Sequence, residues 1–409
     1  MAWTSSAARS IGRDRCHAVH IDSAVYPAQN AAEINHAPPR AMHQAESLAL
    51  LRRVDQRVRL QLSPLAAAID QQGYYPEEIL RGLGEDGAYA ALLPTEAGDG
   101  PGLVAAMAAI AEVGAVCGST AFLAWCQSAS VWLLRHAAPR AELRSLMTEL
   151  AAGRRLGGPG LSNAIKHLAG LEPLRLHAEP CPSGYRISGD LPWVSNIGGG
   201  HVFAAAAAAS DGGKLVFVAD CDAPGVRLCD GPPTAGMAGT RTLSVRLDKV
   251  LVPAERVAAE PADFAAFIRR VRPGFVLAQA AAGLGIVQGC LDDIQEANLR
   301  DGEQNRWLDH SYQDLAAELA DLWREAKTLA PQAEAGQVQP LSVLRLRAAV
   351  GELCLRAAMS AQLHAGAAGF LLSHSAQRRL REASFIAIVT PTLKQLRREI
   401  DLAEQAQPA

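Results

Sequence analysis

The chain has 409 residues, of which 49% are hydrophobic and 20% are charged, and its formal net charge is −3 at pH 7. This composition is typical of a globular protein with a large core, and the length predicts two or three domains. Near-neutral charge without a basic block excludes nucleic acid as an expected partner. The 8 cysteines are scattered without a CxxC pair, which argues against a metal site or a disulfide framework and favours a reducing, cytoplasmic compartment. No apolar run reaches the roughly 18 residues of a membrane span, so no membrane association is expected.

The chain is predicted to begin with an extension and a helical domain. Residues 1–43 show neither helical nor strand periodicity, so we expect them to be a disordered extension. Residues 44–155 are expected to be helical, and an apolar stretch at 103–137 predicts two buried helices broken near Gly118. An apolar stripe at helical spacing opens this domain, formed by Leu48, Leu51, Val54 and Val58.

The pattern changes twice further along the chain. Within residues 156–260, two apolar runs at 201–210 and 214–221 flank a glycine-containing turn and predict a β-hairpin. Several other short strand candidates favour a small barrel or sandwich. Residues 261–409 return to long helical patterns, with an apolar stripe at Leu315, Leu319 and Leu322. Neither a G-x-G-x-x-G turn after a strand nor a P-loop is present, so Rossmann and P-loop folds have no support.

One tryptophan has an unusual setting. Trp193 is one of only 6 tryptophans, and it stands among small and polar residues in the stretch GDLPWVSNIGGG. A core tryptophan normally has apolar neighbours on both sides in sequence. We therefore expect its ring to face something flat and polar.

Several segments, in order, resemble the acyl-CoA dehydrogenase family of flavoproteins over roughly residues 45–405. GYRISGDLPWVSN resembles the family's β-domain element G-x-x-W-I-(T/S)-N, and GMAGTRTLSVRLDKVLVPAERV resembles its second β motif. HAGAAGF and RLREASFIAIVTPT resemble its C-terminal turn and closing helix. The resemblance implies a mainly α fold with a central β domain: an N-terminal helical domain, a small β-barrel or sandwich, and a C-terminal four-helix bundle. It also implies FAD as the cofactor, whereas the expectation of no metal rests on the scattered cysteines.

The resemblance implies which residues contact FAD. In the family, the tryptophan of the β-domain element lies beside the flavin ring and the following residues bond the edge of the ring. Packing of this tryptophan against the helical domain is the alternative. The implied contacts to the flavin are Trp193, Val194 and Ser195 in this element, Leu161, Ser162 and Asn163 in the loop that replaces the family's T-E-P…G-S-D, and Thr390 and Thr392 in the last segment. Arg300 is implied for the diphosphate across a dimer interface. Gly366 and Ala367 are implied for the adenine end of the cofactor from a neighbouring subunit. A solvated arginine at Arg300, a helix cap at the glycine turn and a solvent-facing hydroxyl at Thr392 are the alternatives.

The sequence departs from the family at the catalytic base. Family dehydrogenases use a glutamate to abstract the proton α to the thioester, either in an E-G-T element on the closing helix or on the first helix of the bundle. Here Thr390, or Leu393 if the helix is slid by three residues, stands at the first position, and residues 264–291 contain no acidic residue. His167 is the candidate replacement base, and a surface loop histidine is the alternative.

Three functions therefore stay open. The first is an oxidoreductase acting on CH–CH donors, which desaturates an acyl thioester with a non-standard base. The second is a flavin-dependent monooxygenase on the same fold, acting on a small amine, sulfur heterocycle or phenol. The third is a non-catalytic homologue. The expected partners are a small-molecule substrate such as an acyl-CoA, an electron-transfer flavoprotein or flavin reductase, and copies of the same chain in a homodimer or homotetramer.

Overall fold

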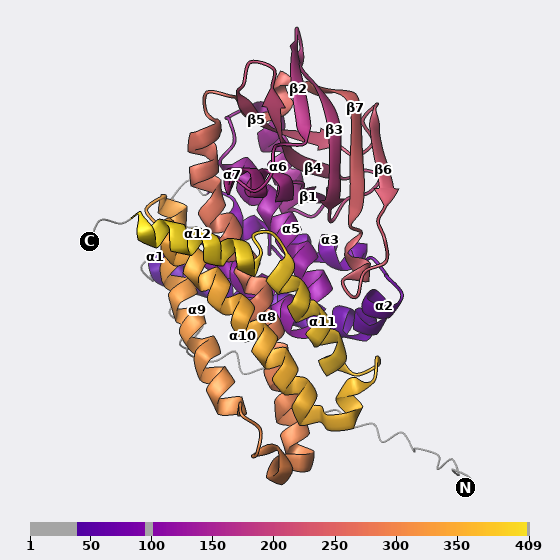
Figure 1. The fold of residues 1–409 in the computed structure, drawn as a ribbon, viewed down its shortest axis with the longest axis vertical. Coiled ribbons are helices and arrows are strands. Elements are labelled where there is room, and N and C mark those ends of the chain that lie inside the picture. The colour runs from indigo at the N-terminus through magenta and orange to yellow at the C-terminus, as the bar shows by residue number, and fades with distance from the viewer. Residues whose placement is uncertain (1–38, 95–100, 407–409) are drawn as a thin grey trace.

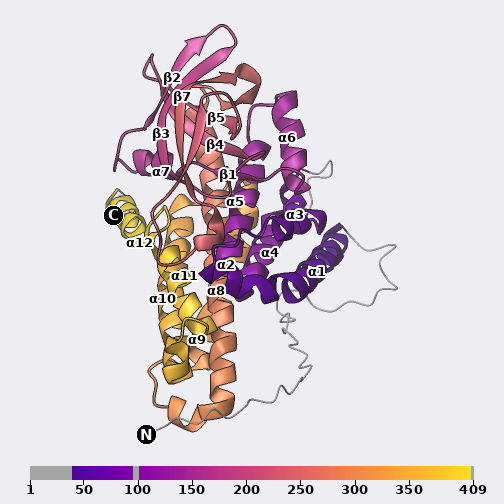
Figure 2. The same cartoon turned by 90° about the vertical axis from the view of Figure 1, so that its right-hand side faces the viewer.

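The computed structural model of the protein describes residues 39–94 and 101–406. Three parts are visible in Figures 1 and 2: a group of N-terminal helices, a sheet at one end of the molecule, and long C-terminal helices. The C-terminal helices run beside the N-terminal group and extend away from the sheet.

The N-terminal part is helical, as the sequence predicts. Its elements are α1 (Pro39–Arg57), the π-helical turn η2 (Val58–Leu62), the 3-10 turns η3 (Ser63–Leu65) and η4 (Ala90–Leu92), α2 (Ala66–Gln71), α3 (Glu77–Glu85), α4 (Gly102–Val116), α5 (Gly118–Arg135) and α6 (Ala141–Ala151). The predicted break near Gly118 is confirmed, and Leu51, Val54 and Val58 of the predicted stripe are buried.

The expected extension at residues 1–43 needs a correction at its end. Helix α1 already begins at Pro39. Proline is favoured at the first position of a helix because its missing N–H has no intrahelical partner there anyway, and good helix formers follow it. Residues 1–38 lie outside the described residues.

The middle of the chain forms a mixed sheet. Its strands are β1 (Gly157–Pro159), β2 (Leu176–Cys181), β3 (Gly184–Val194), β4 (Val202–Ala209), β5 (Lys214–Asp220), β6 (Val226–Asp230), β7 (Leu243–Pro253) and β8 (Val257–Ala259). The short helix α7 (Ser162–Leu168) lies between β1 and β2 in the chain, and the 3-10 turns η5 (Ala238–Thr240) and η6 (Ala254–Arg256) flank β7. The order is β6-β7-β3-β2-β4-β5-β8, and β1 pairs with β4. The predicted hairpin is confirmed, because β4 and β5 pair antiparallel from Val202 opposite Asp220 onward.

The sheet has a core of its own. Side chains from six strands meet in one buried cluster that includes Ile187, Phe203, Phe217 and Leu247. Strands at opposite ends of the strand order thus share one interior, which is the arrangement expected of a small barrel or sandwich.

The C-terminal part is a bundle of long helices. Its elements are α8 (Phe264–Asn305), α9 (Tyr312–Ala335), α10 (Pro340–Ala365), the 3-10 turn η7 (Gly366–Phe370), α11 (Ser375–Ile388) and α12 (Leu393–Gln405). Ser311 and Asp314 form a capping box at the start of α9, and Gly336 adopts a left-handed conformation at its end. Leu315 and Leu319 of the predicted stripe are buried. The observed architecture is therefore mainly α with a central sheet, as expected.

Helix α8 is the central helix of the molecule. It contains a window long and apolar enough to cross a membrane by length and composition, but 94% of that window is buried inside the protein, as in the core helix of a soluble protein. Small residues let α4 approach it closely: a Cβ on Gly285 would lie 2.2 Å from the Ala111 carbonyl oxygen. Trp125 and Trp132 of α5 donate their ring N–H groups to the α8 carbonyls of Phe275 and Val271.

Candidate active site

The ring of Trp193 lies partly in solvent at the end of β3. It is 45% exposed, unlike Trp125 and Trp132. A Cβ on Gly231 would lie 3.3 Å from the ring, so the absence of a side chain there leaves the indole its place. The exposed ring face can receive a flat ligand, as the sequence predicts.

The hydroxyl of Ser195 has only its acceptor capacity left. Ser195 Oγ lies 2.7 Å from Thr242 Oγ1, and Thr242 Oγ1 lies 2.8 Å from Thr240 Oγ1. Thr240 donates its proton to the Met237 carbonyl oxygen at 2.7 Å. Because each hydroxyl has one proton, Thr242 must donate to Thr240 and Ser195 to Thr242. Ser195 can therefore accept a hydrogen bond from a ligand but not donate one.

Asn196, which the sequence-based site omitted, holds the segment after Trp193 in place. It is fully buried with a left-handed φ of 63°. Its side chain accepts from the Tyr75 hydroxyl at 2.7 Å and donates to the Gly157 carbonyl at 2.7 Å. The N-terminal helices, β1 and the Trp193 segment thus meet at one side chain. Its position directly after W-V-S is the signal that could have identified it.

Helix α7 brings a second hydroxyl into the site. Ser162 donates a hydrogen bond to the Thr390 hydroxyl at 2.9 Å, which joins the sheet part to the loop between α11 and α12. The structure thus brings together two residues predicted separately from positions 228 apart in the sequence.

The residues flanking Ser162 have other roles. The Leu161 side chain is buried in the main core. The Asn163 amide donates to Glu172 and to the Pro173 carbonyl, and its oxygen accepts from the Arg175 N–H. Val194 is also buried, in the core of the sheet. Leu161 and Val194 can contact a ligand only through the backbone.

A buried polar chain runs behind Thr390. The Thr390 carbonyl oxygen accepts a hydrogen bond from the Gln279 amide of α8 at 3.1 Å, and the Gln279 side-chain oxygen accepts one from Arg347 Nε of α10 at 3.0 Å. Arg347 also donates to the Ile386 carbonyl at the end of α11. Burial lowers the pKa of the Arg347 guanidinium to about 10, so it stays protonated at neutral pH. Sequence analysis missed Gln279 and Arg347 because both stand in apolar helical stretches without a motif.

His167 lies on α7 but away from the Ser162 contact. It is half-buried, and its Nδ1 lies 3.1 Å from the Glu172 carbonyl oxygen, which requires a proton on Nδ1 and leaves Nε2 as the acceptor. Five residues of a helix turn through about 500°, which places His167 about 140° around α7 from Ser162. A role for His167 as the base stays a prediction. Its tautomer leaves Nε2 able to accept a proton, but its side chain lies on a different face of α7 from that of Ser162.

Thr392 and Leu393 have structural contacts. The Thr392 hydroxyl accepts from the Gln395 N–H and caps the start of α12. This N-cap is a third role beside the predicted flavin contact and solvent exposure. Leu393, the alternative position for the glutamate, is partly buried against α10.

The other predicted cofactor residues lie at the far end of the bundle. Arg300 is half exposed, beside Glu296 at 3.4 Å, and the helix kinks at Asp301. Gly366 ends α10 with a φ of 60°, and Ala367 follows it in η7. About 30 Å of α8 separate Arg300 from Gln279 at the 1.5 Å rise of a helix. The predicted cofactor set therefore forms two separate groups in one chain.

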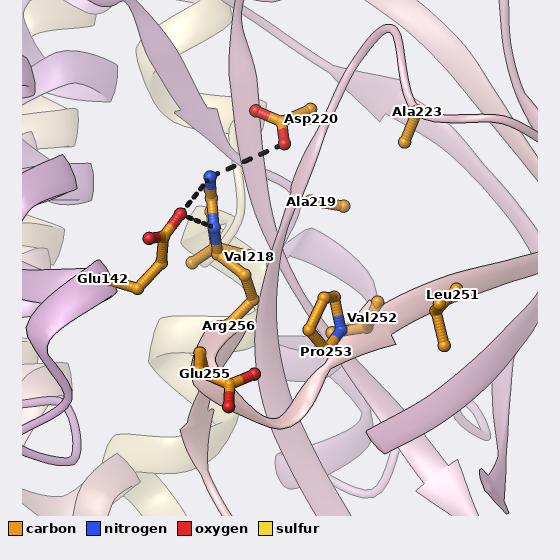
Figure 3. A pocket seen from close by; sticks show the side chains of 10 residues that line it. All are labelled: Glu142, Val218, Ala219, Asp220, Ala223, Leu251, Val252, Pro253, Glu255 and Arg256. Carbon is orange, nitrogen blue, oxygen red and sulfur yellow. Dashed lines mark hydrogen bonds and ion pairs between the residues drawn. The ribbon is translucent and has the colours of Figure 1, made fainter. Parts of the chain in front are cut away.

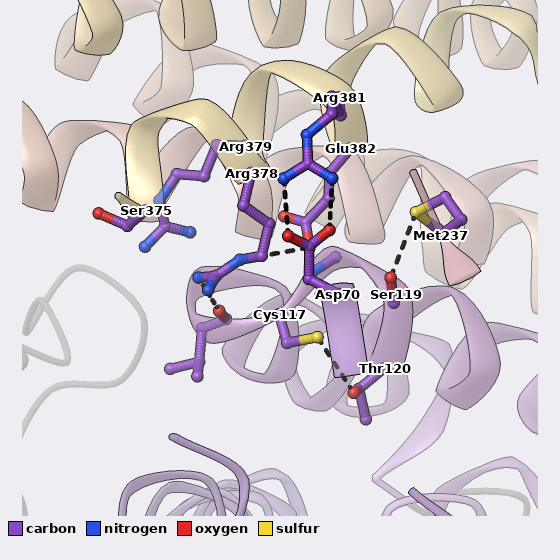
Figure 4. Close-up of polar contacts among 12 residues, drawn as sticks. Asp70, Cys117, Ser119, Thr120, Met237, Ser375, Arg378, Arg379, Arg381 and Glu382 are labelled. Atoms are coloured by element: carbon purple, nitrogen blue, oxygen red, sulfur yellow. Dashed lines mark hydrogen bonds and ion pairs between the residues drawn. The ribbon is translucent and has the colours of Figure 1, made fainter. Parts of the chain in front are cut away.

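The acidic residue that precedes Thr390 along α11 is sealed in the core. Glu382 is buried, accepts from the Gly118 N–H at 3.0 Å and lies 3.5 Å from Arg378. Burial raises the pKa of this carboxyl. In Figure 4, Glu382 lies beside the bidentate ion pair of Arg381 with Asp70. It stands about two helical turns before Thr390 and caps α5, so it is no replacement base.

Two hollows in the described surface lie outside this group of residues. One is a groove of about 310 Å³ beside β5 and β7, in which Arg256 lies 2.8 Å from Glu142. Its lining side chains are drawn in Figure 3. A second hollow of about 410 Å³ lies between the loop after α8 and the end of α10. Neither is lined by Trp193, Ser162 or Thr390.

Solved structures with the same arrangement define the class of fold. Butyryl-CoA dehydrogenase from Megasphaera elsdenii matches with a TM-score of 0.78 and 18% identity, covering 88% of this chain and 98% of its own. A glutaryl-CoA dehydrogenase from Mycobacterium smegmatis, in complex with FADH2, matches at 0.73 and 19%, covering 89% and 95%. Dibenzothiophene monooxygenase (TdsC) from Paenibacillus sp. A11-2 matches at 0.74 and 17%, covering 88% and 98%. The fold is that of the acyl-CoA dehydrogenases.

Sequence comparison supports the same assignment. Residues 44–154 match the family model of the acyl-CoA dehydrogenase N-terminal domain. The Bacillus subtilis (strain 168) protein named "Probable acyl-CoA dehydrogenase YngJ" is 26% identical over 347 residues, which are 80% of this chain and 90% of that protein. Together, the N-terminal domain match, the sequence relatives and the shared fold support a member of the acyl-CoA dehydrogenase family.

Proposed function

We propose that this chain is a flavin-dependent oxidoreductase whose reaction uses no carboxylate base on the loop after α11. The observation that carries the proposal is the hydroxyl of Thr390, which stands where the family resemblance places the glutamate and accepts a hydrogen bond from Ser162. A hydroxyl has no basic form at neutral pH, so proton abstraction at this position has no acceptor.

The residues present fit FAD. The Trp193 ring presents an exposed face for stacking, and Ser195 offers a hydrogen-bond acceptor beside it. When bound, FAD would supply the two-electron redox chemistry. Trp193 and Ser195 would orient the ring, while Ser162 and Thr390 would line the substrate side. Arg300, Gly366 and Ala367 lie too far along the bundle for the same cofactor, so we assign them to the cofactor of a neighbouring copy.

Dehydrogenation of an acyl thioester is the first candidate reaction. Its support is the sequence similarity to acyl-CoA dehydrogenases over most of the chain. This reaction needs a base from outside the Thr390 loop, and His167 is the candidate with a free Nε2. The substrate would be an acyl-CoA, and an electron-transfer flavoprotein would take up the electrons.

Oxygen insertion into a small amine, sulfur heterocycle or phenol is the second candidate reaction. Two observations favour it: the hydroxyl at position 390, and the fold shared with dibenzothiophene monooxygenase. Such a reaction needs no proton abstraction from carbon, and a flavin reductase would supply the electrons.

An exposed apolar surface supports a homodimer or homotetramer. The large apolar side chains exposed near the far ends of α8 and α10 and in the segment after η7 are Leu299, Trp307, Met359, Leu363, Phe370, Leu371 and Leu372. Exposed apolar side chains in such numbers mark contact surfaces. Light scattering on the purified protein should give a multiple of the chain mass.

The first experiment is the visible absorption spectrum of the purified protein before and after anaerobic addition of a mixed set of acyl-CoAs. A flavin spectrum that bleaches supports dehydrogenation. An unchanged flavin spectrum, with oxygen consumption once a flavin reductase is added, supports oxygen insertion. Absence of stoichiometric flavin after reconstitution with FAD would overturn the proposal and favour a non-catalytic homologue.

Substituting Trp193 tests where the flavin lies. Trp193→Ala should weaken FAD binding about tenfold, the equivalent of about 1.4 kcal/mol of stacking. Arg300→Ala should weaken flavin retention more, because it removes a charged contact to the diphosphate. The quantity to measure is the flavin-to-protein ratio of each purified variant. Unchanged flavin content in both the Trp193 and Arg300 variants would contradict the site.

A further inference from the structure

Arg347 is a fully buried cation without an acidic partner among the described residues. Its side chain bonds two neutral oxygens, of Gln279 and of the Ile386 carbonyl, and its Nη1 has no hydrogen-bond partner. Within residues 39–94 and 101–406, no carboxylate forms an ion pair with it. Burying an unpaired charge costs free energy, so its retention requires a reason.

The hydrogen bonds of Arg347 lead to the proposed site. Gln279 accepts from Arg347 and donates to the Thr390 carbonyl oxygen, so one amide group separates the guanidinium from the loop after α11. Arg347 also bonds the end of α11, directly before this loop. Two hydrogen bonds and the amide between them place Arg347 Nε within about 8 Å of the Thr390 carbonyl oxygen, a range over which a charge acts effectively in a dry interior.

The Thr390 hydroxyl is free to donate toward a ligand. Ser162 supplies the proton of the bond between the two hydroxyls, so the proton of Thr390 is not used in it. A donor backed by a buried cation favours a negatively charged oxygen over a neutral one. A neutral donor would be enough to bond the Ile386 carbonyl at the end of α11, so that bond does not account for the charge of Arg347.

We propose that Arg347 supplies a fixed positive charge to the loop Val389–Thr392, so that the substrate group held at the Thr390 hydroxyl is bound as an anion. This assignment rests on the proposed function, in which Thr390 lines the substrate side of the flavin. The substrate class that matches is a compound that binds as an oxyanion, namely an enolate, phenolate or carboxylate. Arg347 is a positioning residue, because it acts through Gln279 and touches no substrate.

The other charges around this loop are paired or distant. Glu399 of α12 is paired with Arg272, Glu352 of α10 with Arg397, and Glu382 of α11 lies 3.5 Å from Arg378. Lys394 follows the loop in an exposed position, and the thiol of Cys354 lies near Arg347 with its pKa raised to about 12 by burial. Arg347 is thus the buried, unpaired charge that acts on the loop.

A thiol introduced by Thr390→Cys measures this charge without a flavin. We expect Arg347 to hold the pKa of that thiol low relative to the Arg347→Met background, in which the thiolate fraction at pH 7 should fall at least tenfold. The pKa is read from the pH dependence of alkylation at residue 390 by mass spectrometry. Thiolate absorbance relative to the parent protein provides a second measurement that needs no reagent access.

Two further variants separate charge from structure. Arg347→Lys keeps the charge and should preserve the low thiol pKa even if it lowers stability. Arg356→Met removes a paired arginine from the exposed face of the same helix and should leave the thiol pKa unchanged. An equal thiol pKa with and without Arg347, or between the Lys and Met variants, would overturn the inference.

Benzoate and its neutral analogue benzamide test the substrate class in the otherwise unmodified protein. Benzoate should bind at least tenfold more tightly by tryptophan fluorescence, and Arg347→Met should abolish that preference. Equal affinities in the parent protein would refute anion selection. A low thiol pKa in a protein that takes up no flavin would instead refute the proposed function alone.

Discussion

The hydrogen bond between Ser162 and Thr390 is the contact on which the functional proposal depends. It joins a helix of the sheet part to a loop of the bundle, and both hydroxyls replace residues that the family resemblance makes acidic or flavin-binding. Because Thr390 is buried and fixed by Gln279, a side chain placed there would point into a defined environment.

Restoring a carboxylate at this position should restore base catalysis. Thr390→Glu should increase the rate of anaerobic flavin bleaching by an acyl-CoA about a hundredfold or more, because a positioned general base contributes factors of this size. Thr390→Gln has the same shape without a basic oxygen and serves as the control. Equal rates for the two variants would show that the flavin and the 390 side chain do not meet at the substrate.

A second residue, Glu112 on α4, should influence stability through its protonation. Burial, and then the neighbouring Asp55 and Asp292, raise the pKa of this carboxyl from 4.5 to about 7. A raised pKa means that the folded state binds the proton more tightly than the unfolded state, so this contribution is complete below pH 4.5 and is lost as the pH rises to about 7. At 1.36 kcal/mol per pKa unit, the loss is about 3 kcal/mol.

The variant Glu112→Gln isolates this effect. Between pH 4.5 and 7, the free energy of unfolding in urea should fall by about 3 kcal/mol more in the parent protein than in the variant. Parallel pH profiles for the two proteins would show that Glu112 is solvated.

At the scale of elements, the contact of α8 with α4 organises the helical core. Glycines and alanines meet across the contact: a Cβ on Gly114 would lie 3.1 Å from the Ala282 carbonyl oxygen, and at Gly285 the backbone of α4 occupies the space of a side chain. Small residues allow the two helix axes to approach closely, so a single added methyl group must push them apart.

Gly285→Ala should therefore destabilise the protein by about 1–3 kcal/mol despite the better helix propensity of alanine. Gly302→Ala lies on the same helix with no atom within 4 Å of its Cβ, and it should be neutral or stabilising. Urea denaturation of both variants provides the comparison. Equal effects would mean that propensity, not packing, dominates at Gly285.

At the scale of the whole molecule, the ion pair of Asp70 and Arg381 ties three segments together. Asp70 comes from α2, Arg381 from α11, and Arg381 also donates to the Ala235 carbonyl in the segment between β6 and η5. Figure 4 shows the two side chains facing each other. The N-terminal helices, the sheet part and the bundle are all anchored at this point.

Asp70→Asn should cost about 3–5 kcal/mol of unfolding free energy, because it leaves a largely buried arginine without its partner. Asp321→Asn removes an exposed pair with Arg324 and should cost less than about 1 kcal/mol. The quantity to measure is the chemical denaturation midpoint of each variant. A loss at Asp70 no larger than at Asp321 would show that the three parts are held together without this ion pair.

The sequence by itself determined the order of the three parts, the break at Gly118, the β4–β5 hairpin and the unusual setting of Trp193. These features depend on local periodicity, turn residues and composition, which act between residues close in the chain. The family resemblance then added Ser162 and Thr390 as separate candidates.

Only the tertiary structure decided that these two hydroxyls meet, that the proton of Ser195 is already engaged, and that Arg347 lies buried behind Thr390 without a counter-ion in the part of the chain that the structure describes. Each of these facts depends on contacts between segments far apart in sequence. An arginine in a helical stretch has the same sequence signal whether it faces solvent or the core, and only tertiary packing decides whether its guanidinium is buried.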